Sequence, residues 1–215
     1  MGKKNYSVSG KVVLITGGAR GIGAELATRL HAKGARLVLT DLDAAPLTEL
    51  ADRLGRDRLL AVVADVRDPE AMVAAARQAI EQFGGIDVVV ANAGVGSFGS
   101  VLNIDPAAFK KVVDINLTGV FNTVHAALAS VIERRGYVLV VSSMAAFVAA
   151  PGMAAYAASK SGAENFANAL RQEVAHLGVD VGSAHIDGVP GPTGALVNGA
   201  PPWSKGPSSL PCSSS

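Results

Sequence analysis

The stretch Lys11-Val-Val-Leu-Ile-Thr16-Gly-Gly-Ala-Arg-Gly-Ile-Gly23 decides the fold of this chain. Its first half is a short apolar run that predicts a buried β-strand. The residues that follow, 24–33, have helical periodicity, and Gly34 ends that helix. A strand, a glycine-rich turn and a helix in this order form the context that a dinucleotide-binding turn requires. We therefore expect the first strand and helix of a parallel α/β sheet, with the turn facing a pyrophosphate.

The three glycines of this turn have separate tasks. Gly17 permits the tight turn, Gly21 lets the backbone approach a pyrophosphate, and Gly23 lets the helix pack closely on the strand. The N-terminus of the helix adds N–H donors and a positive dipole. The spacing G-x-x-x-G-x-G differs from the commoner G-x-G-x-x-G, and such turns also serve merely to join a strand to a helix. The candidate cofactor-binding residues here are Thr16, Gly17, Arg20, Gly21, Ile22 and Gly23.

Asp41 follows the second predicted strand, 35–40, and lies 18 residues beyond Gly23. An acidic residue near that position binds the adenosine ribose hydroxyls and repels a 2′-phosphate, which favours NAD over NADP. Arg20 acts in the opposite direction, because its guanidinium can pair with that phosphate. We expect Asp41 to prevail, so NAD is the predicted cofactor and NADP the alternative. A solvated strand end, or the N-cap of the next helix, is the structural alternative for Asp41.

Strands and helices alternate along the rest of the chain. Asp68-Pro69-Glu70 caps one of the helices, with proline at its first position. The alternation predicts an α/β protein with a doubly wound parallel sheet, in three α/β/α layers. Further helices are predicted at 44–54, 69–83, 105–133 and 155–177, and further strands at 59–64, 86–91, 138–143 and 179–184.

Tyr156-Ala-Ala-Ser-Lys160 is the candidate for chemistry. Four residues apart on a helix, Tyr156 and Lys160 lie on one face, one turn from each other. A nearby ammonium favours the phenolate and so lowers a tyrosine pKa that starts near ~10. Ser143 ends the strand before this helix, at the sheet edge where such folds bind ligands. Taken alone, a tyrosine and a lysine at this spacing are more often packing and a solvated charge.

The bulk composition limits the classes of function. The chain has 215 residues, of which 49% are hydrophobic and 17% charged, as expected for one packed globular domain. Its formal net charge is +1, without a basic stripe, so no nucleic-acid partner is expected. The N-terminus lacks an apolar signal segment, and the most apolar stretch, 138–150, is too short to span a bilayer. The single cysteine, Cys212, fits a reducing compartment. We expect a cytoplasmic protein without a membrane partner.

The isolated polar residues are less informative. The four histidines show no ligand spacing, so no metal site is predicted. His185 ends the sixth predicted strand and is a weak candidate for touching substrate, with an ordinary structural or surface histidine as the favoured interpretation. Asn116 lies within a predicted helix, where an asparagine is normally a tolerated surface residue. Residues 186–215 are rich in proline, glycine and serine and predict an irregular tail after a domain at 1–185.

Two further motifs, Asp65-Val66 and Asn92-Ala-Gly94, each follow a predicted strand. With these motifs and those described above, residues 8–185 resemble the short-chain dehydrogenase/reductase family. Ser143 precedes Tyr156 by 13 residues, the spacing usual in that family. The resemblance implies a Rossmann-type fold and an NAD(P)-dependent oxidoreductase that interconverts a secondary alcohol and a ketone. The matching motifs, in chain order, are Thr16-Gly-Gly-Ala-Arg-Gly-Ile-Gly23, Asp65-Val66, Asn92-Ala-Gly94, Asn116, Ser143 and Tyr156-x-x-x-Lys160.

The resemblance also implies residue roles. Tyr156 would be the general acid/base, Lys160 would lower its pKa and bind the nicotinamide ribose, and Ser143 would hold the substrate oxygen. Asn116 would hold a water in the proton relay, which reverses the surface interpretation given above. The remaining family positions would bind the cofactor: Asp65 and Val66 at the adenine, and Asn92, Ala93 and Gly94 along its central region.

Two further expectations concern assembly and extent. Family members are often homodimers or homotetramers joined through the helices that correspond to 105–133 and 155–177. They usually continue with a Pro-Gly, a substrate-covering segment and a seventh strand, of which only Pro190-Gly191 has a counterpart here. An apolar alcohol or ketone is the expected substrate, with Val95, Phe98, Phe147, Val148 and Met153 around the site. The alternatives are a non-catalytic dinucleotide-binding protein that lacks the substrate lid, and a form that folds poorly.

Overall fold

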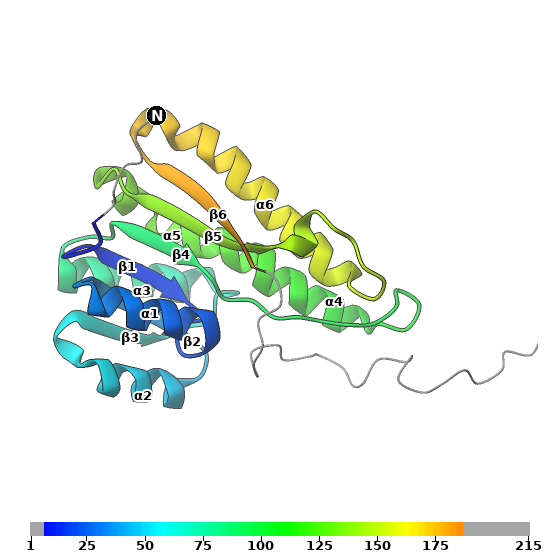
Figure 1. The fold of residues 1–215 in the computed structure, drawn as a ribbon, viewed down its shortest axis with the longest axis horizontal. Helices are drawn as coiled ribbons and strands as arrows, with labels where there is room; N and C mark the ends of the chain where they lie inside the picture. Colours follow the sequence, from blue (N-terminus) through cyan, green and yellow to red (C-terminus); the bar gives the residue numbers. More distant parts are fainter. Residues whose placement is uncertain (1–6, 187–215) are drawn as a thin grey trace, which may run out of the picture.

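The computed structural model of the protein describes residues 7–186. These residues form one sheet of parallel strands with helices on both faces (Figure 1). The strands are β1 (Val12–Thr16), β2 (Arg36–Asp41), β3 (Leu59–Val63), β4 (Val88–Ala91), β5 (Tyr137–Ser143) and β6 (Asp180–Ile186). The helices are α1 (Gly21–Ala32), α2 (Ala44–Leu54), α3 (Pro69–Phe83), α4 (Pro106–Val113), α5 (Gly119–Glu133) and α6 (Ala154–Val174). Pro190-Gly191 and nearly all of the predicted tail lie outside the described residues.

The order of strands across the sheet is β3-β2-β1-β4-β5-β6. The chain first winds outward from β1 to β3, then returns past β1 to β4 and winds outward on the other side. This reversal is the topological switch point, and ligands of such sheets bind beyond the carboxyl ends of the strands beside it. The Rossmann-type doubly wound fold predicted from the alternation of elements is therefore confirmed.

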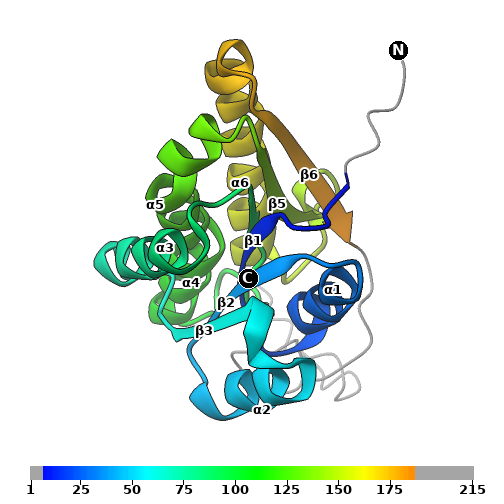
Figure 2. The same ribbon diagram turned by 90° about the vertical axis from the view of Figure 1, so that its left-hand side faces the viewer.

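The helices cover the sheet in two layers. Helices α1 and α2 lie on one face, while α3, α5 and α6 lie on the other (Figure 2). Alternate residues of a strand point to opposite faces, so β1 sends Leu14 to the layer of α3, α5 and α6 and Ile15 to that of α1 and α2. Both faces are covered, which explains why the strand sequences are almost continuously apolar.

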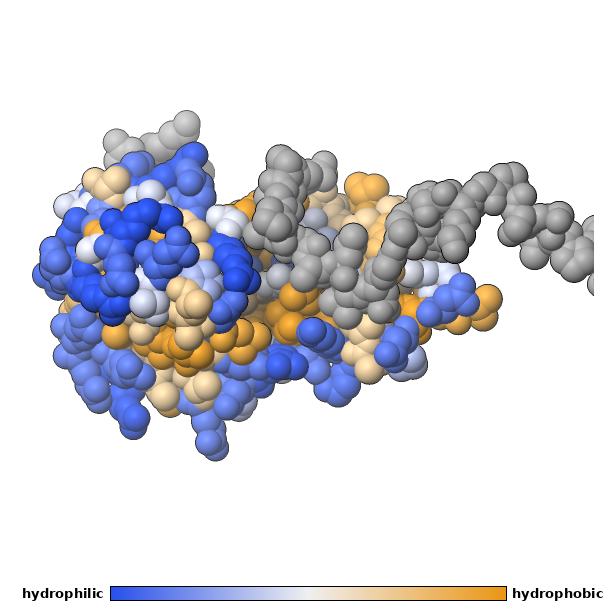
Figure 3. Space-filling view, turned by 90° about the horizontal axis from the view of Figure 1, so that it is seen from below, coloured by the Kyte–Doolittle hydropathy of each residue, from blue (hydrophilic) through white to orange (hydrophobic). Residues whose placement is uncertain are grey.

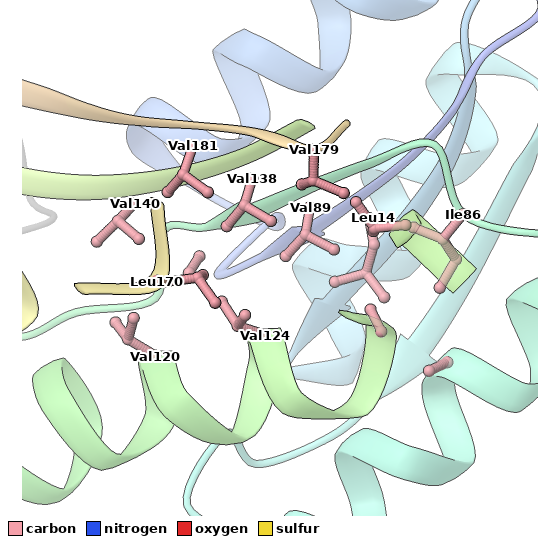
Figure 4. Packing of buried hydrophobic residues seen from close by; sticks show 14 of the residues in the cluster. Leu14, Ile86, Val89, Val120, Val124, Val138, Val140, Leu170, Val179 and Val181 are labelled. Carbon is pink, nitrogen blue, oxygen red and sulfur yellow. The ribbon is translucent and has the colours of Figure 1, made fainter. Parts of the chain in front are cut away.

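The larger core lies between the sheet and helices α3, α5 and α6. Leu14, Val89 and Val138 project from neighbouring strands toward Val124 of α5 and Leu170 of α6 (Figure 4). None of these five side chains is more than 4% exposed. Full burial of one such side chain is worth about 1.5–3 kcal/mol, so this layer holds α5 and α6 firmly against the sheet.

Local boundaries differ slightly from the sequence predictions. Helix α1 begins at Gly21 and not at residue 24, so two glycines of the turn belong to its first turn. Helix α3 has the predicted cap, in which the Asp68 carboxylate accepts hydrogen bonds from the amides of Glu70 and Ala71. Strand β6 extends to Ile186, two residues beyond the predicted end.

The predicted long helix at 105–133 is interrupted. A π-helical turn, Asp114–Thr118, separates α4 from α5. The whole helical stretch, Pro106–Glu133, is long and apolar enough to cross a membrane by length and composition, but more than half of its most apolar window is buried. Its contacts with β4 and β5 are those of a core helix.

Candidate functional site

The glycine turn between β1 and α1 is shaped by backbone conformations that favour glycine. Gly17 and Gly21 have φ angles of +62° and +53°, in the left-handed region. A Cβ added at Gly23 would overlap the carbonyl oxygen of Gly17. The first turn of α1 therefore lies directly against the end of β1, and its free amides face the carboxyl edge of the sheet. This arrangement fits the pyrophosphate cradle that the sequence predicted.

Asn92 and Thr16 fix the turn to the neighbouring strand β4. The Asn92 side-chain amide donates hydrogen bonds to the carbonyl oxygens of Thr16, at 2.8 Å, and Gly17, at 3.1 Å. In return, the Thr16 hydroxyl oxygen accepts from the backbone amides of Asn92 and Ala93, both at 3.1 Å. These residues were predicted to contact a cofactor, and the structure shows that they also hold the cradle in shape.

Asp41 lies at the end of β2 beside the same turn. Its carboxylate accepts a 3.0 Å hydrogen bond from the amide of Ala19, within the turn. Arg20, which was predicted to compete for a 2′-phosphate, forms a 2.5 Å ion pair with Asp43 at the surface. This ion pair was not predicted, although Asp43 lies only two residues beyond the end of β2 and is the acidic residue next after Asp41.

Asp65 and Val66 follow β3. Asp65 is partly exposed, and Val66 is buried. Asp65 pairs with Arg67, and the side-chain hydrogen bond from this guanidinium is the largest cause of the lowered pKa of Asp65. Val66 is buried against Gly119 of α5, and its carbonyl accepts a 2.9 Å hydrogen bond from Asn122. Val66 therefore lies just beyond the carboxyl end of β3, against the start of α5, and its contact with adenine stays a prediction.

Lys160 and Tyr156 occupy the first turns of α6, which packs on β5. Lys160 is 4% exposed, and its ammonium donates a 2.8 Å hydrogen bond to the carbonyl of Val141 in β5. Burial of the ammonium lowers the pKa of Lys160 from 10.5 to about 8. The Lys160 nitrogen lies 5.8 Å from the centroid of the Tyr156 ring. The predicted pair is therefore formed, with the lysine inside and the half-buried tyrosine nearer the surface.

Asn116 lies within the π turn and is fully buried, so the interpretation as a tolerated surface asparagine is wrong. Its carbonyl accepts from the amide of Val95 at 2.8 Å, and its amide donates to the carbonyl of Val95 and to the hydroxyl of Ser159. A Cβ added at Gly94 would lie 3.3 Å from the Asn116 oxygen and 3.5 Å from the Lys160 nitrogen. Gly94, Asn116 and Lys160 therefore meet at one point.

Ser143 lies at the carboxyl end of β5, two residues beyond the carbonyl that Lys160 binds. The residue is 7% exposed, and its hydroxyl oxygen accepts a 3.2 Å hydrogen bond from the amide of Ala145. The Ser161 hydroxyl of α6 donates to the carbonyl of Ala146, which ties the segment after Ser143 to the helix of Tyr156. All four predicted catalytic residues, Ser143, Tyr156, Lys160 and Asn116, thus lie on elements packed around one edge of the sheet.

His185, the weak candidate for touching substrate, lies beside a carboxylate of α6. The His185 ring lies 2.9 Å from the carboxylate of Glu164 on α6, a partner that the sequence analysis did not consider. Within residues 7–186 no three histidine, cysteine, aspartate or glutamate side chains are grouped so that they could hold a metal ion.

Comparison with known proteins identifies relatives of this chain. A family model for short chain dehydrogenases matches residues 11–195. Trans-4-hydroxycyclohexanecarboxylate dehydrogenase of Sinomonas cyclohexanicum is 36% identical over 89% of this chain and 77% of its own length. Oxidoreductase UcpA of Escherichia coli is 40% identical over 81% of this chain and 67% of its own. The bovine dehydrogenase/reductase SDR family member 7B is 36% identical over 81% of this chain, which spans 56% of that relative's length.

Solved structures of similar fold include proteins with bound cofactor. The 3-ketoacyl-(acyl-carrier-protein) reductase of Brucella melitensis, complexed with NADH, superposes with a TM-score of 0.80 and 31% identity, over 83% of this chain and 76% of that one. Carveol dehydrogenase of Mycobacterium avium, in complex with NAD, has a TM-score of 0.79 and 32% identity, over 83% of this chain and 71% of that one.

Proposed function

The chain belongs to the short-chain dehydrogenase/reductase family, a family of oxidoreductases, and from this premise we propose that it interconverts a secondary alcohol and a ketone with NAD as the cofactor. The observation that carries the proposal is the buried ammonium of Lys160, one helical turn from Tyr156 and within reach of Gly94 and Asn116. A buried, nearly unpaired charge costs stability, so its place beside a phenol and a cofactor cradle argues for a chemical task.

The residues around the switch point fit an NAD molecule. The cradle of Gly17, Gly21 and Gly23 suits a pyrophosphate, because glycine at position 23 lets the first turn of α1 lie directly against the Gly17 carbonyl. Asp41 suits the ribose hydroxyls, and its charge disfavours a 2′-phosphate. When bound, NAD supplies the hydride acceptor of the reaction, and the protein orients it and controls the proton.

The proposed task of Tyr156 is to exchange a proton with the substrate oxygen. The Lys160 ammonium lies 5.8 Å from the centroid of the Tyr156 ring, and its hydrogen bond to Val141 holds it in place. The Ser143 hydroxyl orients the substrate oxygen. Asn116, which is hydrogen-bonded to the backbone of Val95, positions a water for the proton relay. Proton transfer by a positioned side chain contributes typically about 10²–10⁴-fold to a rate.

The surface around this edge supports an apolar substrate. Phe147 and Val148 are both 62% exposed in the segment after Ser143, and Val101 and Leu102 are 77% and 91% exposed in the loop after β4. Apolar surface is visible toward the end of the molecule opposite α2 (Figure 3). The exposed Phe121 of α5, stacked on His125, supports a homodimer or homotetramer formed through α5 and α6.

The test is NADH formation from a panel of hydrophobic secondary alcohols. Tyr156→Phe removes only the reacting hydroxyl, so turnover should be lost while stabilisation by NAD remains. Tyr137→Phe is the matched control, because it removes a hydroxyl at the opposite end of β5 and should leave turnover intact. Turnover retained in Tyr156→Phe would overturn the proposed role. NAD binding without any turnover by the unaltered protein would favour a non-catalytic dinucleotide-binding protein.

A further inference from the structure

A polar cluster interrupts the apolar contact between α6 and the sheet. Glu164 is 7% exposed on the face of α6 that also buries Ala163, Ala167 and Leu170. Its carboxylate lies 2.9 Å from the Nε2 atom of His185 in β6. Glu164 is buried among apolar side chains of α6, whereas His185 is exposed, so the pair joins a core position to the surface of β6.

In this pair the Glu164 side chain is an ionised carboxylate. Burial, the largest effect, raises the pKa of Glu164, but the hydrogen bond with His185 and the hydroxyls of Ser183 and Ser142 outweigh it and hold the pKa below its ordinary value. The two serine hydroxyls face the carboxylate without a hydrogen bond of ordinary geometry within the described residues. An ion pair with one exposed partner adds at most about 1 kcal/mol to stability, so stability alone does not explain the position of Glu164 and His185.

His185 of this pair contacts the segment that follows Ser143. The His185 ring contacts the Phe147 ring edge to face, with centroids 5.0 Å apart and an angle of 64° between the planes. His185 is paired with Ser142 across β5 and β6, and the next pair in register is Ser143 with Ile186. The carboxylate on α6 therefore fixes an imidazole that lies in register with Ser142, one residue before the candidate catalytic serine, and supports Phe147.

We propose that Glu164 and His185 are positioning residues that hold Phe147 as an aromatic wall of the substrate site, and so determine how tightly a bulky apolar alcohol binds. The inference rests on the proposed function, since it assigns Phe147 to the substrate side of that site. Glu164 orients the imidazole through Nε2, the imidazole orients the phenyl ring, and the phenyl ring packs against the apolar part of the alcohol. An edge-to-face aromatic contact is worth about 0.5–1.5 kcal/mol, which corresponds to a change in affinity of about 2- to 10-fold.

The kinetic test separates substrate binding from chemistry. His185→Leu and Glu164→Leu should raise KM for a bulky apolar alcohol about 2- to 10-fold and leave kcat nearly unchanged. Glu164→Gln keeps an acceptor for the imidazole and should restore most of the affinity. In a Phe147→Ala background, His185→Leu should have no further effect on KM, because its effect passes through that ring. Arg171→Leu is the matched control, since it removes another tie between α6 and β6, to the carbonyl of Val181.

Hydrogen exchange tests the same inference without any turnover. The amides of Phe147 and Val148 both donate to the carbonyl of Met144, at 3.0 Å. Both amides should exchange faster in Glu164→Leu, while those of the helix at Tyr156–Lys160 exchange as before. Unchanged exchange at Phe147 and Val148, an equal rise of KM in Arg171→Leu, or a fall of kcat at constant KM would each overturn the proposal. Faster exchange in a protein that turns over no alcohol would instead keep the positioning role and reject the proposed reaction.

Discussion

Lys160 and Val141 are joined by a buried hydrogen bond of 2.8 Å, from an ammonium to a neutral backbone carbonyl. Within the described residues Lys160 has no ion-pair partner, and the cause of its lowered pKa is burial alone. The native protein therefore bears the cost of a desolvated charge at the position where the proposed chemistry uses it. A lowering from 10.5 to about 8 corresponds to about 3 kcal/mol at neutral pH.

Lys160→Met should abolish turnover and stabilise the protein. Below pH 8 both folded and unfolded chains carry the charged lysine, so the native state bears the full burial cost. Between pH 8 and 10.5 the unfolded chain binds more protons, so this cost is relieved and the stability of the unaltered protein rises relative to the variant. The variant should gain about 1–2 kcal/mol at pH 7, because the lost bond to Val141 offsets part of the gain. Urea unfolding at pH 7 and at pH 10 measures both effects. Equal differences at the two pH values would contradict this account.

Asn116→Ala should destabilise the fold as well as the site. The change removes the side-chain partner of the Val95 amide and carbonyl, and one of two partners of the Ser159 hydroxyl, which also donates to the carbonyl of Tyr156. We expect a loss of about 2–4 kcal/mol in the free energy of unfolding. Asn122→Ala, also buried, loses a single hydrogen bond to Val66 and should cost about 1 kcal/mol. Similar losses in the two variants would show that the three bonds of Asn116 do not act together.

Gly23→Ala should destroy stabilisation by NAD. The added methyl group would overlap the Gly17 carbonyl and approach the Asn92 amide nitrogen to 2.8 Å, so the turn has to shift. Gly96→Ala is the control, because a Cβ there meets nothing within 4 Å. The shift in melting temperature with added NAD is the measurement. A Gly23→Ala protein that NAD stabilises as well as it does the control would remove the turn from the cofactor site.

Asp41→Ala should weaken discrimination between NAD and NADP. The carboxylate would bind ribose hydroxyls and repel a 2′-phosphate, so its removal should change the ratio of the two affinities about 10-fold in favour of NADP. Asp43→Ala frees Arg20 from an exposed pair that is worth at most about 1 kcal/mol, and should raise NADP affinity only slightly. Titration calorimetry with both cofactors is the measurement. Equal affinity of the unaltered protein for NAD and NADP would contradict the assignment of Asp41.

Local signals predicted most of the fold. Asp68 and Pro69 mark the start of α3, and glycines mark the turn after β1, because caps and left-handed turns depend on residues close in the chain. Side-chain partners from distant segments were not predictable in this way. Asn116 is buried because Val95 and Ser159 satisfy it, and Glu164 meets His185 across a helix–strand contact. The spacing of apolar residues, with its period of 2 in strands and 3.6 in helices, does not indicate such pairs. This explains why the surface interpretation of Asn116 was wrong.

The π turn at Asp114–Thr118 accommodates one more residue than a regular helix would place there. Removal of one residue from this turn would let α4 and α5 join as one regular α-helix that keeps the faces on both sides, because the turn holds the extra residue as a bulge. Such a deletion would improve the helix and carry Asn116 away from Val95 and Ser159. At this turn a regular helix and the hydrogen bonds of Asn116 therefore exclude each other.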